Sequence, residues 1–465
     1  MRAIEQNLNL KYIWAISLAA ALGGLLFGYD WVVVGGAKPF FEKHFQLASE
    51  QTSGWANSCA LLGCLLGALI SGGLSERFGR KKLLIAAAAL FAVSSVLTGW
   101  ASTFAWFVTW RIAGGVAIGM ASNLSPMYIA EVAPAHLRGR LVAVNQLTIV
   151  MGVLGAQVVN WLIARSVPEG ATAEFIRQSW NGQYAWRWMF TAVAGPALVF
   201  LAGAWLVPES PRWLLKNGKA EAARAILTRI GGAAYAEYEV RDVQTTLAAG
   251  EIRHVRLKTL LEPKMIKILL IGTTLAVLQQ WSGINVIFNY AEEIFREAGY
   301  GVSSILFNIV ITGTVLLLFT FVAIQTVDHF GRRMLLLTGC AGISVFHGLI
   351  GLGYYFHLKG LIVVVPVLCT IACYSFSLAP LAWVVVAEIF PNRIRGPAMS
   401  VAVSGLWIAC FLLTYSFPLL NKALGAAGTF WLYSAIVAAG FFFILHWVPE
   451  TKGKSLEQIE RELVD

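Results

Sequence analysis

The sequence predicts an all-α membrane protein of twelve transmembrane helices, arranged as two related six-helix halves. Three observations predict it: an apolar composition, twelve apolar runs long enough to cross a bilayer, and charge motifs that occur once in each half. The 465 residues are 58% hydrophobic and only 13% charged, with a mean hydropathy of +0.68. Soluble domains carry about 25% charged residues, so this chain holds too few charges to cover a water-exposed surface.

Twelve apolar runs account for most of the chain. A helix needs about 20 mostly apolar residues to cross the hydrocarbon core of a bilayer. The first run is long enough to span and contains Tyr29 and Asp30, so we expect a retained helix rather than a cleaved signal peptide. The runs lie at 12–34, 54–75, 83–101, 104–127, 140–164, 187–207, 267–292, 302–326, 332–353, 360–387, 396–420 and 428–448.

One long polar segment, 208–266, separates the sixth run from the seventh. It is rich in Lys, Arg, Glu and Ala, and we expect it to form short amphipathic helices on a membrane surface. The predicted organisation is therefore an N-terminal six-helix half at 1–207, a cytoplasmic linker at 208–266, a C-terminal six-helix half at 267–448 and a cytoplasmic tail at 449–465.

The distribution of positive charge predicts the orientation in the membrane. Twelve spans place both termini on one side, and about three-quarters of the 35 Lys and Arg residues fall in the loops and tails of that side. Short cytoplasmic loops carry such an excess, so we expect both termini to be cytoplasmic and the protein to lie in the inner membrane. The net charge of +10 then belongs to these loops, and no nucleic-acid partner is expected.

Three charge motifs occur twice, once in each half and in the same order. The copies are about 250 residues apart, which indicates an internal duplication. The chain is therefore predicted to consist of two homologous halves. The pairs are Glu76-Arg77-Phe78-Gly79-Arg80-Lys81 with Asp328-His329-Phe330-Gly331-Arg332-Arg333, Glu131 and Arg138 with Glu388 and Arg395, and Pro208-Glu209-Ser210 with Pro449-Glu450-Thr451.

The charged members of these motifs are candidates for a gate on the cytoplasmic side. A gate needs contacts that hold in one conformation and break in another, and Arg–carboxylate pairs at helix ends are strong yet reversible. The alternative is that they are topology signals and solvated loop charges; their repetition in register favours the gate. The candidates are Glu76, Arg77, Arg80, Glu131, Arg138, Glu209, Asp328, Arg332, Arg333, Glu388, Arg395 and Glu450.

Asp30 in the first run and Arg111 in the fourth are the only formal charges within the cores of their spans. A charged side chain at that depth is costly, so we expect the two to pair. The pair also offers a mechanism, because protonation of Asp30 would release Arg111 and link reorientation of the protein to a proton. The alternative is a static structural ion pair.

Carboxamides and aromatic rings inside the membrane predict a site for a neutral, hydroxyl-rich ligand. A carboxamide both donates and accepts hydrogen bonds, which matches vicinal hydroxyls, and aromatic faces cover the C–H surfaces of a sugar. A single Gln in a transmembrane helix more often joins helices, but a cluster around a glycine favours a ligand. The cluster is Gln279, Gln280 and Asn285 around Gly283, and the further candidates are Gln146, Trp383, Phe27 and Trp407.

Together these motifs resemble the sugar porter family of the major facilitator superfamily over essentially the whole chain. The segment GMASNLSPMYIAE at 119–131 is similar to that of the bacterial proton-coupled sugar symporters. The resemblance implies two halves with substrate bound between them near the midplane, and charge networks that stabilise the outward-facing state. Proton-coupled members have an Asp at the position of Asp30, which facilitative members usually lack. The sugar-binding positions that it implies are Gln146, Gln279, Gln280, Asn285 and Trp383.

Three features depart from the family pattern. Sugar porters often have Tyr-Tyr where this chain has Asn289-Tyr290, a pair that helps to close the outer gate and contacts sugar. Leu316 and Leu406 stand where the family often has a polar residue. The C-terminal side of the site is therefore expected to be less polar than usual, so a pentose or deoxyhexose is expected as readily as glucose.

The leading functional hypothesis is a monosaccharide:proton symporter that works by alternating access as a monomer. One alternative is a facilitator or exchanger for a sugar or a polyol such as inositol; another is a membrane sugar sensor, for which the tail after Pro449 is short. An enzyme is not expected, because the sequence shows no nucleophile–base pair, metal-ligand cluster or glycine-rich phosphate loop. All six cysteines lie inside apolar runs, and neither a cofactor nor a metal is expected.

Overall fold

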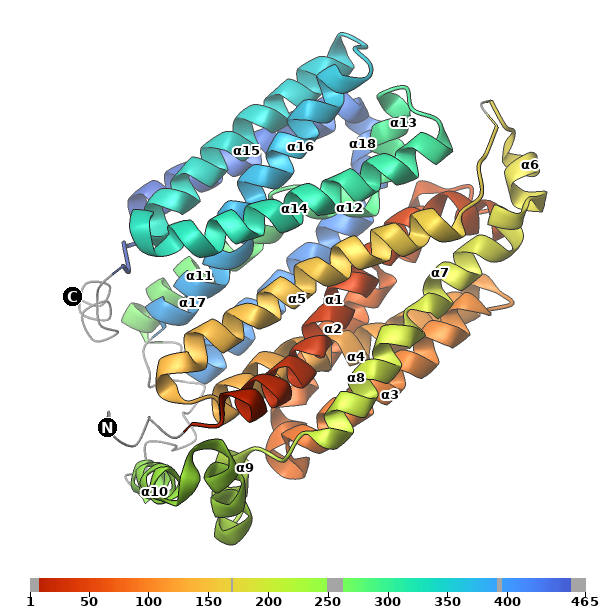
Figure 1. The fold of residues 1–465 in the computed structure, drawn as a ribbon. Helices are drawn as coiled ribbons and strands as arrows, with labels where there is room; N and C mark the ends of the chain where they lie inside the picture. Colours follow the sequence, from red (N-terminus) through yellow and green to blue (C-terminus); the bar gives the residue numbers. More distant parts are fainter. Residues whose placement is uncertain (1–7, 169, 249–261, 391–394, 453–465) are drawn as a thin grey trace.

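The computed structural model describes residues 8–168, 170–248, 262–390 and 395–452, and nearly all of them are helical. Two helical bundles lie side by side, one from each half of the chain (Figure 1). The described chain begins (red) and ends (blue) on the same side of the molecule, which we call the terminal side. The opposite side, where the short helices α6 (Ala173–Gln178) and α13 (Ala291–Glu297) lie, is called the far side.

The N-terminal half contains six spans. The first span extends to His44, although the apolar run ends at Val34, because Gly35 to Ala37 are buried and remain helical. Lys38 therefore lies within a helix rather than in a loop. Five spans are single helices: α1 (Leu10–His44), α2 (Glu50–Phe78), α3 (Arg80–Gly99), α4 (Phe104–Val132) and α5 (Ala135–Ile163). The sixth consists of a π-helical turn (Asn181–Ala185), α7 (Trp186–Ala192) and α8 (Ala194–Leu206).

The C-terminal half repeats this plan with more interruptions. Its helices are α11 (Pro263–Trp281) continued by α12 (Ile284–Asn289), α14 (Val302–Phe330), α15 (Arg332–Tyr355), α16 (Leu361–Phe376) continued by α17 (Leu378–Ile389), and α18 (Arg395–Trp447). α18 has 53 residues and loses helical geometry at Gly425, where φ is 69°, so it supplies the last two spans. The 11 long apolar helices of the described residues therefore make twelve spans, as predicted.

Two helices from the segment that links the halves in sequence pack on the terminal side of the N-terminal half (Figure 1). They are α9 (Pro211–Lys216) and α10 (Ala220–Ala248), and α10 bends at Gly232. The indole Nε1 of Trp213 donates to the carbonyl of Glu76 at 2.9 Å, so α9 is attached to the end of α2. Residues 249–261 of the predicted linker and 453–465 of the predicted tail lie outside the described residues.

Glycines bring α2 and α4 into close contact. A Cβ added to Gly63 or Gly67 would lie 2.1 Å from a backbone carbonyl oxygen of α4. At Gly115 and Gly119 the added Cβ would lie 2.0 and 2.1 Å from carbonyl oxygens of α2. Both helices thus have glycines four residues apart, a spacing that lets transmembrane backbones approach closely. The same packing holds Arg111, one turn before Gly115, in the interior of the half, where it is 4% exposed.

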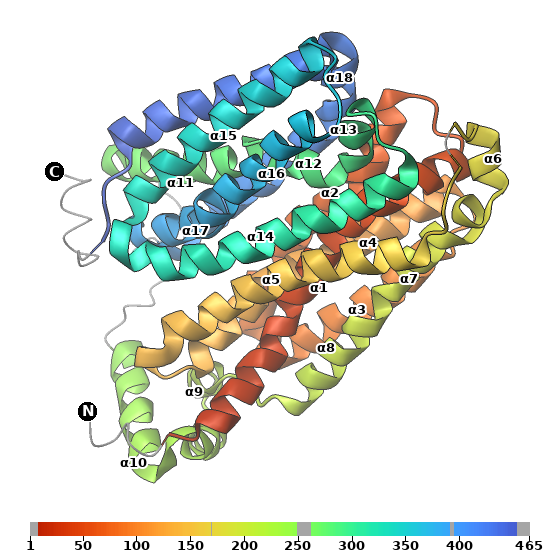
Figure 2. The same ribbon diagram turned by 45° about the horizontal axis from the view of Figure 1, so that its top comes forward.

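The two halves contact each other toward the far side. α5 lies along α14 in both ribbon views (Figures 1 and 2), and Gln157 Nε2 donates to Thr312 Oγ1 at 3.3 Å. α2 contacts α18, where the ring of Trp55 lies edge-on to Phe411 with centroids 6.3 Å apart. These residues lie in the parts of their helices nearer the far side, so the halves are closed together there.

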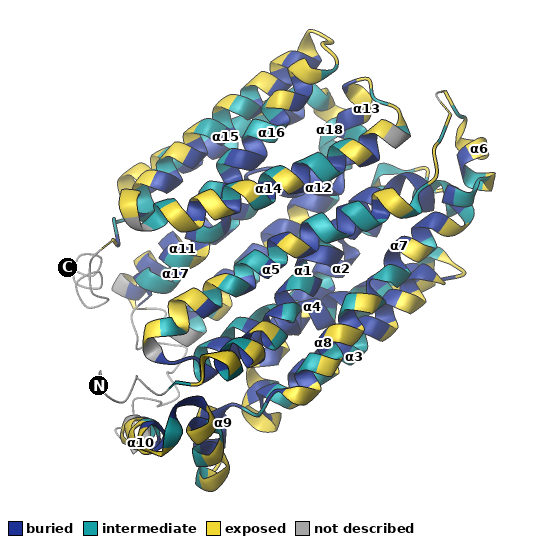
Figure 3. Ribbon diagram, viewed as in Figure 1, coloured by how far each residue is buried: buried dark blue, intermediate teal, exposed yellow. Residues whose placement is uncertain are grey.

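The outer surface of the bundles is apolar. Exposed residues lie on the outward faces of the helices, whereas buried residues lie where helices meet (Figure 3). The exposed side chains include large apolar ones, such as Leu206 at 85%, Leu361 at 71% and Trp205 at 65%. A water-exposed surface of this kind is unfavourable, so these faces are suited to the hydrocarbon of a bilayer.

Candidate functional site

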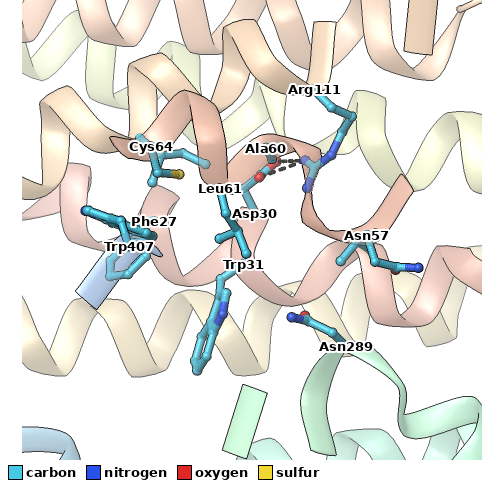
Figure 4. Close-up of a pocket in the computed structure, with 12 residues that line it drawn as sticks. Phe27, Asp30, Trp31, Asn57, Ala60, Leu61, Cys64, Arg111, Asn289 and Trp407 are labelled. Carbon is cyan, nitrogen blue, oxygen red and sulfur yellow. Dashed lines mark hydrogen bonds and ion pairs between the residues drawn. The ribbon is translucent and has the colours of Figure 1, made fainter. Parts of the chain in front are cut away.

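Asp30 on α1 and Arg111 on α4 form the ion pair that the sequence predicts. Arg111 Nη1 lies 2.7 Å from Asp30 Oδ1 and 2.8 Å from Oδ2 (Figure 4). The Arg111 and Asp30 side chains are only 5% and 7% exposed. The two charges therefore compensate each other inside the protein, where neither is stable alone.

The pair leaves part of the Arg111 guanidinium unsatisfied. A single nitrogen bridges both carboxylate oxygens, whereas Arg111 Nε is buried without a hydrogen-bond partner among the described residues. The guanidinium also lies over the ring of Phe190, 5.2 Å from its centroid. Arg–carboxylate pairs are strongest when two nitrogens bind the two oxygens in parallel. Only one nitrogen binds here, so the Asp30–Arg111 contact is weaker than such a bidentate pair.

A pocket lies beside the Asp30–Arg111 pair, between α1, α2 and α4 and the C-terminal half. It brings the pair together with three of the predicted sugar-site residues, Phe27, Asn289 and Trp407 (Figure 4). Asn289 is 2% exposed, and its Oδ1 has no hydrogen-bond partner among the described residues. The predicted coupling pair and part of the predicted sugar site thus share one set of walls.

Of the seven lining residues that were not predicted as site residues, Trp31 and Asn57 carry polar groups. Asn57 Nδ2 donates to the Ser53 carbonyl at 2.9 Å, while its buried Oδ1 has no partner in the described part of the chain. The ring of Trp31 lies 5.5 Å from that of Phe288. A signal existed for both: Trp31 directly follows Asp30, and Asn57 is a carboxamide within an apolar run.

Gln279, Gln280 and Asn285 are joined by hydrogen bonds. Gln280 Nε2 donates to Gln279 Oε1 at 3.2 Å, and Asn285 Nδ2 donates to Gln280 Oε1 at 2.5 Å. Gln279 Nε2 donates to the carbonyls of Leu378 and Ala379 at 3.0 Å each, where α16 gives way to α17. Gln279 therefore joins two helices in this conformation. The Oδ1 of Asn285 is buried without a partner among the described residues and remains a free acceptor.

Gly283 breaks the seventh span between α11 and α12. Its φ of 83° lies in the left-handed region, which glycine adopts without steric cost. An added Cβ would also lie 2.9 Å from His347 Nε2, which itself is 2.8 Å from the Ser282 carbonyl oxygen. The break lets Gln280 and Asn285, which lie on either side of it, come within hydrogen-bond distance.

Aromatic rings from both halves meet next to the pocket. Phe27 of α1 lies edge-on to Trp407 of α18, with centroids 5.8 Å apart. Leu406, which is 4% exposed, precedes Trp407, and Leu316 is also buried. Neither leucine lines the pocket, to which the C-terminal half contributes Asn289 and Trp407.

Six of the predicted sugar-site residues do not line this pocket. Gln146 is half-buried on α5, and Trp383 on α17 is 37% exposed. Tyr290 is buried, and its Oη donates to the Thr414 carbonyl at 2.6 Å, so α18 already holds its hydroxyl. The six are Gln146, Gln279, Gln280, Asn285, Trp383 and Tyr290.

The charge motifs of the N-terminal half form a network on the terminal side. Arg80 Nε and Nη2 donate to the two oxygens of Glu131, each at 3.0 Å, and Nη2 also donates to Glu76 Oε1 at 2.7 Å. Glu209 Oε1 accepts from the backbone N–H groups of Arg80 at 2.9 Å and Lys81 at 3.2 Å, at the start of α3. The network ties the ends of α2, α3 and α4 to the chain that follows α8.

The C-terminal half has a corresponding arrangement. Glu450 accepts from the backbone N–H groups of Arg332 at 3.0 Å and Arg333 at 3.1 Å, at the start of α15. Arg332 Nη2 lies 3.7 Å from Glu388 Oε1. Every ion pair found among the described members of these motifs joins helices of one half rather than the two halves.

Two of the four remaining predicted gate residues, Arg77 and Arg138, form none of the ion pairs described above. Arg77 is exposed, with its guanidinium over the ring of Phe78. Arg138 is exposed and close to Glu239 of α10; burial raises the pKa of Glu239, and the charge of Arg138 counteracts this. The side chains of Asp328 and Arg395 lie outside the described residues.

The whole chain resembles known sugar transporters. Residues 16–463 match the family model described as Sugar (and other) transporter. The chain belongs to this family. This sugar transporter is 37% identical to the D-xylose-proton symporter of Escherichia coli (strain K12), over 97% of this chain and 96% of that protein. It is 37% identical to the arabinose-proton symporter of Bacillus subtilis (strain 168), over 98% and 96%, and 40% identical to the glucose transport protein of Synechocystis, over 98% of each.

Solved structures confirm the predicted fold of this sugar transporter. The partially occluded inward open conformation of the xylose transporter XylE from E. coli matches with a TM-score of 0.83 and 36% identity, over 96% of this chain and 100% of that chain. The inward open conformation also matches with a TM-score of 0.83, over 97% and 99%. Because the halves are joined toward the far side, this sugar transporter is closed there, in keeping with a conformation that opens toward the terminal side.

Replacement of Glu450 tests whether the duplicated motif stabilises this sugar transporter. Burial alone raises the pKa of Glu450, but N–H groups of Lys452, Arg332 and Arg333 stabilise its carboxylate and leave the pKa lowered. The stability that the Glu450 carboxylate gives the folded protein is therefore complete above pH 4.5, its ordinary pKa. That stability is lost as the pH falls through the lowered pKa of the folded state. We expect Glu450→Gln to lower the free energy of unfolding by about 1 kcal/mol at pH 7, as for loss of a helix cap.

The measurement is thermal unfolding in detergent at pH 7 and at pH values below 4.5. The difference between Glu450→Gln and wild type is expected to shrink at the lower pH. Glu221→Gln is the matched control, because the Glu221 side chain on α10 is 88% exposed and should contribute nothing measurable. An equal loss in both variants, or a Glu450→Gln effect that is the same at both pH values, contradicts the capping role.

Proposed function

We propose that this protein carries a monosaccharide, a pentose or a hexose, across the membrane together with a proton by alternating access. One observation carries the proposal: the buried Asp30–Arg111 pair lies beside the pocket that Phe27, Asn289 and Trp407 line where the halves meet. Because Asp30 and Arg111 themselves line the pocket, a change in their contact also changes the shape of the ligand pocket. Relatives named as D-xylose-proton and arabinose-proton symporters support this substrate class and this coupling.

The proton acts on the contact between α1 and α4. While Asp30 is ionised, it holds Arg111 through one nitrogen. Protonation removes the negative charge, so Arg111 is released and α1 is loosened from α4. Because α1 also carries Phe27, which touches Trp407 of the other half, the change is transmitted to the junction of the halves. Each proton that enters down a potential of 100 mV supplies about 2.3 kcal/mol for sugar uptake.

The sugar binds to carboxamides and aromatic faces between the halves. Asn285 Oδ1 and Asn289 Oδ1 accept no hydrogen bond from the described residues, and half-buried Gln280 links Asn285 to Gln279. Gln279 and Tyr290 donate hydrogen bonds to backbone carbonyls in this conformation. In this state they therefore fix the positions of the site residues next to them rather than offering these donors to a sugar. The full proposed set is Gln146, Gln279, Gln280, Asn285, Asn289, Tyr290, Phe27, Trp383 and Trp407.

The protein is proposed to work as a monomer in the inner membrane with both termini cytoplasmic. The positive charge of the terminal-side loops supports this orientation. The far side then faces outward, and the present conformation opens to the cytoplasm. The charge motifs are proposed to gate the cytoplasmic side; in this open state their described ion pairs lie within each half.

A facilitator or exchanger for a sugar or a polyol is the second candidate. One relative is named simply as a glucose transport protein, without mention of a proton. A static Asp30–Arg111 ion pair would suit a transporter that is not coupled to protons. The two candidates differ in one property, which is whether sugar entry moves protons.

Sugar-driven proton movement tests the proposal. Purified protein in liposomes, with a pH-sensitive dye outside, is given D-xylose, L-arabinose, D-glucose, L-fucose or myo-inositol. We expect at least one monosaccharide to be taken up with alkalinisation of the medium, because each sugar enters with a proton. Liposomes without protein, and L-glucose, are the controls. Saturable uptake without a pH change identifies a facilitator, and no uptake of any compound contradicts the proposed function.

A further inference from the structure

A second buried ion cluster lies on the far side, and the sequence did not predict it. Lys38 of α1 forms an ion pair with Glu293 of α13, and Lys38 Nζ is 3.0 Å from Glu42 Oε2. The side chains of Lys38, Glu293 and Glu42 are 3%, 16% and 17% exposed. The Lys38–Glu293 pair joins the N-terminal half to the C-terminal half, unlike the ion pairs described on the terminal side.

Other helices enclose the same cluster. Ser53 of α2 donates to Glu42 Oε1 at 2.5 Å, and Lys38 Nζ lies 5.4 Å from the centre of the Tyr290 ring. Next to Glu293 in sequence, Glu292 is 4% exposed and pairs with Arg296 at 2.8 Å.

The described cluster contains more carboxylates than cations. If every group were ionised, it would carry a net negative charge with little access to water, which is unfavourable. One proton would balance it. The acids are Glu42, Glu292 and Glu293, and the bases are Lys38 and Arg296.

Glu293 is the member that is suited to take this proton. One of its oxygens binds Lys38, but Oε2 is buried without a hydrogen-bond partner among the described residues. A carboxylate oxygen that lacks both water and a donor gains most from protonation. Burial raises the pKa of Glu293 to about 7; Lys38 opposes the shift, and Glu292 and Glu42 add to it.

The cluster is buried only because the halves touch at this point. α1 approaches α12 so closely that a Cβ on Gly35 would lie 2.2 Å from the Phe288 carbonyl oxygen. Alternating access requires the halves to separate on the far side. Separation parts Lys38 from Glu293 and exposes the carboxylates to water, where Glu293 returns to its ordinary acidity.

We propose that Lys38 and Glu293 form a latch that holds the far side closed, and that closing the latch places a proton on Glu293 Oε2, separate from the one on Asp30. Glu293 Oε1 then still accepts from the Lys38 ammonium, whose charge is balanced by Glu42. The proton comes from the far-side solution when the latch closes and returns there when it opens. It therefore sets the balance between conformations and is not transported. The inference rests on the alternating access proposed above, but its test needs neither sugar nor uptake.

The test measures the distance between spin labels on the far-side ends of the two halves, at Glu174 and Leu358, without sugar. All variants carry Asp30→Asn, so that residue 30 can neither gain nor lose a proton. We expect the ratio of closed to open far-side conformers to rise as pH falls from 8 to 5.5, by up to about tenfold per pH unit below 7. Adding Glu293→Gln should abolish this pH dependence, because glutamine is neutral at every pH.

Lys38→Met tests the latch itself. We expect it to lower the closed-to-open ratio by about tenfold or more, because it leaves buried carboxylates without their cation. Lys422→Met is the matched control: the Lys422 side chain is 68% exposed, pairs with Glu50 across the same junction, and should change the ratio less than about twofold.

Three results would overturn the inference. They are a ratio independent of pH in the Asp30→Asn protein, a pH response that survives Glu293→Gln, and a Lys38→Met ratio equal to that of Lys422→Met. A protein that failed to transport sugar would still give these distances, so failure of the proposed function is distinguishable from failure of the latch.

Discussion

Asp30→Asn is expected to abolish proton-driven accumulation of sugar while sugar exchange continues. One proton moving down 100 mV supplies about 2.3 kcal/mol, which corresponds to about a fiftyfold concentration ratio. Wild type should approach that ratio, whereas the variant should reach a ratio of about 1. The reason is that asparagine cannot ionise, so Arg111 loses its charged partner and the protein reorients with or without a proton.

The measurement compares uptake of labelled sugar against its gradient with counterflow exchange in the same proteoliposomes. Glu174→Gln is the matched control, because Glu174 is a carboxylate on far-side α6 whose side chain is 54% exposed. This control should accumulate sugar as wild type does. Accumulation by Asp30→Asn within about twofold of wild type would leave a static ion pair as the better description. If the variant lost both exchange and accumulation, Asp30 would be needed for the fold rather than for coupling.

The spans and the Asp30–Arg111 pair were predictable from the sequence because the bilayer imposes strong rules. Helices are the form in which a single segment satisfies its own backbone inside lipid, so apolar length alone marks them. A lone charge in such a segment needs a partner, and these two spans offered one charge each. Both predictions follow from local sequence and one energetic cost, without knowledge of how the helices pack.

The far-side cluster was not predictable in the same way. Lys38 lies beyond the predicted end of the first run, and its partner Glu293 lies in the other half of the chain. Their contact depends on how closely the halves approach, which is a property of the conformation and not of any segment. Hydropathy assigned Lys38 to a loop, because a helix that continues through glycines after its apolar run gives no signal of its own.

The roles of individual polar groups were also beyond the sequence. Gln279 was predicted as a ligand group, yet its amide binds the two carbonyls at the break between α16 and α17. Glu209 and Glu450 were predicted as gate residues, and both bind the backbone at the start of a helix. The sequence identifies which residues are polar. Their hydrogen-bond partners, however, depend on where helices break and begin, which only the folded backbone defines.

Gly35→Val is expected to hold the far side open and to reduce transport by about a hundredfold. In the present conformation a Cβ at Gly35 would lie 2.2 Å from the Phe288 carbonyl oxygen, which belongs to the other half. A hundredfold change corresponds to about 2.7 kcal/mol, within the range for overpacking. When the halves separate on the far side, the valine no longer meets α12, so the folded protein and its binding of sugar from that side should persist.

Two measurements check this, counterflow exchange and the spin-label distance between Glu174 and Leu358. Exchange should fall and the distance should increase, with no loss of thermal stability, because the clash exists in one conformer only. Gly155→Val on α5 is the matched control, since an added Cβ there meets nothing within 4 Å, and it should transport normally. Normal exchange by Gly35→Val, or a distance that stays at the closed value, would mean that α1 and α12 need not come this close during the cycle. The far-side latch would then have to act through Lys38 and Glu293 alone, without the backbone contact that encloses them.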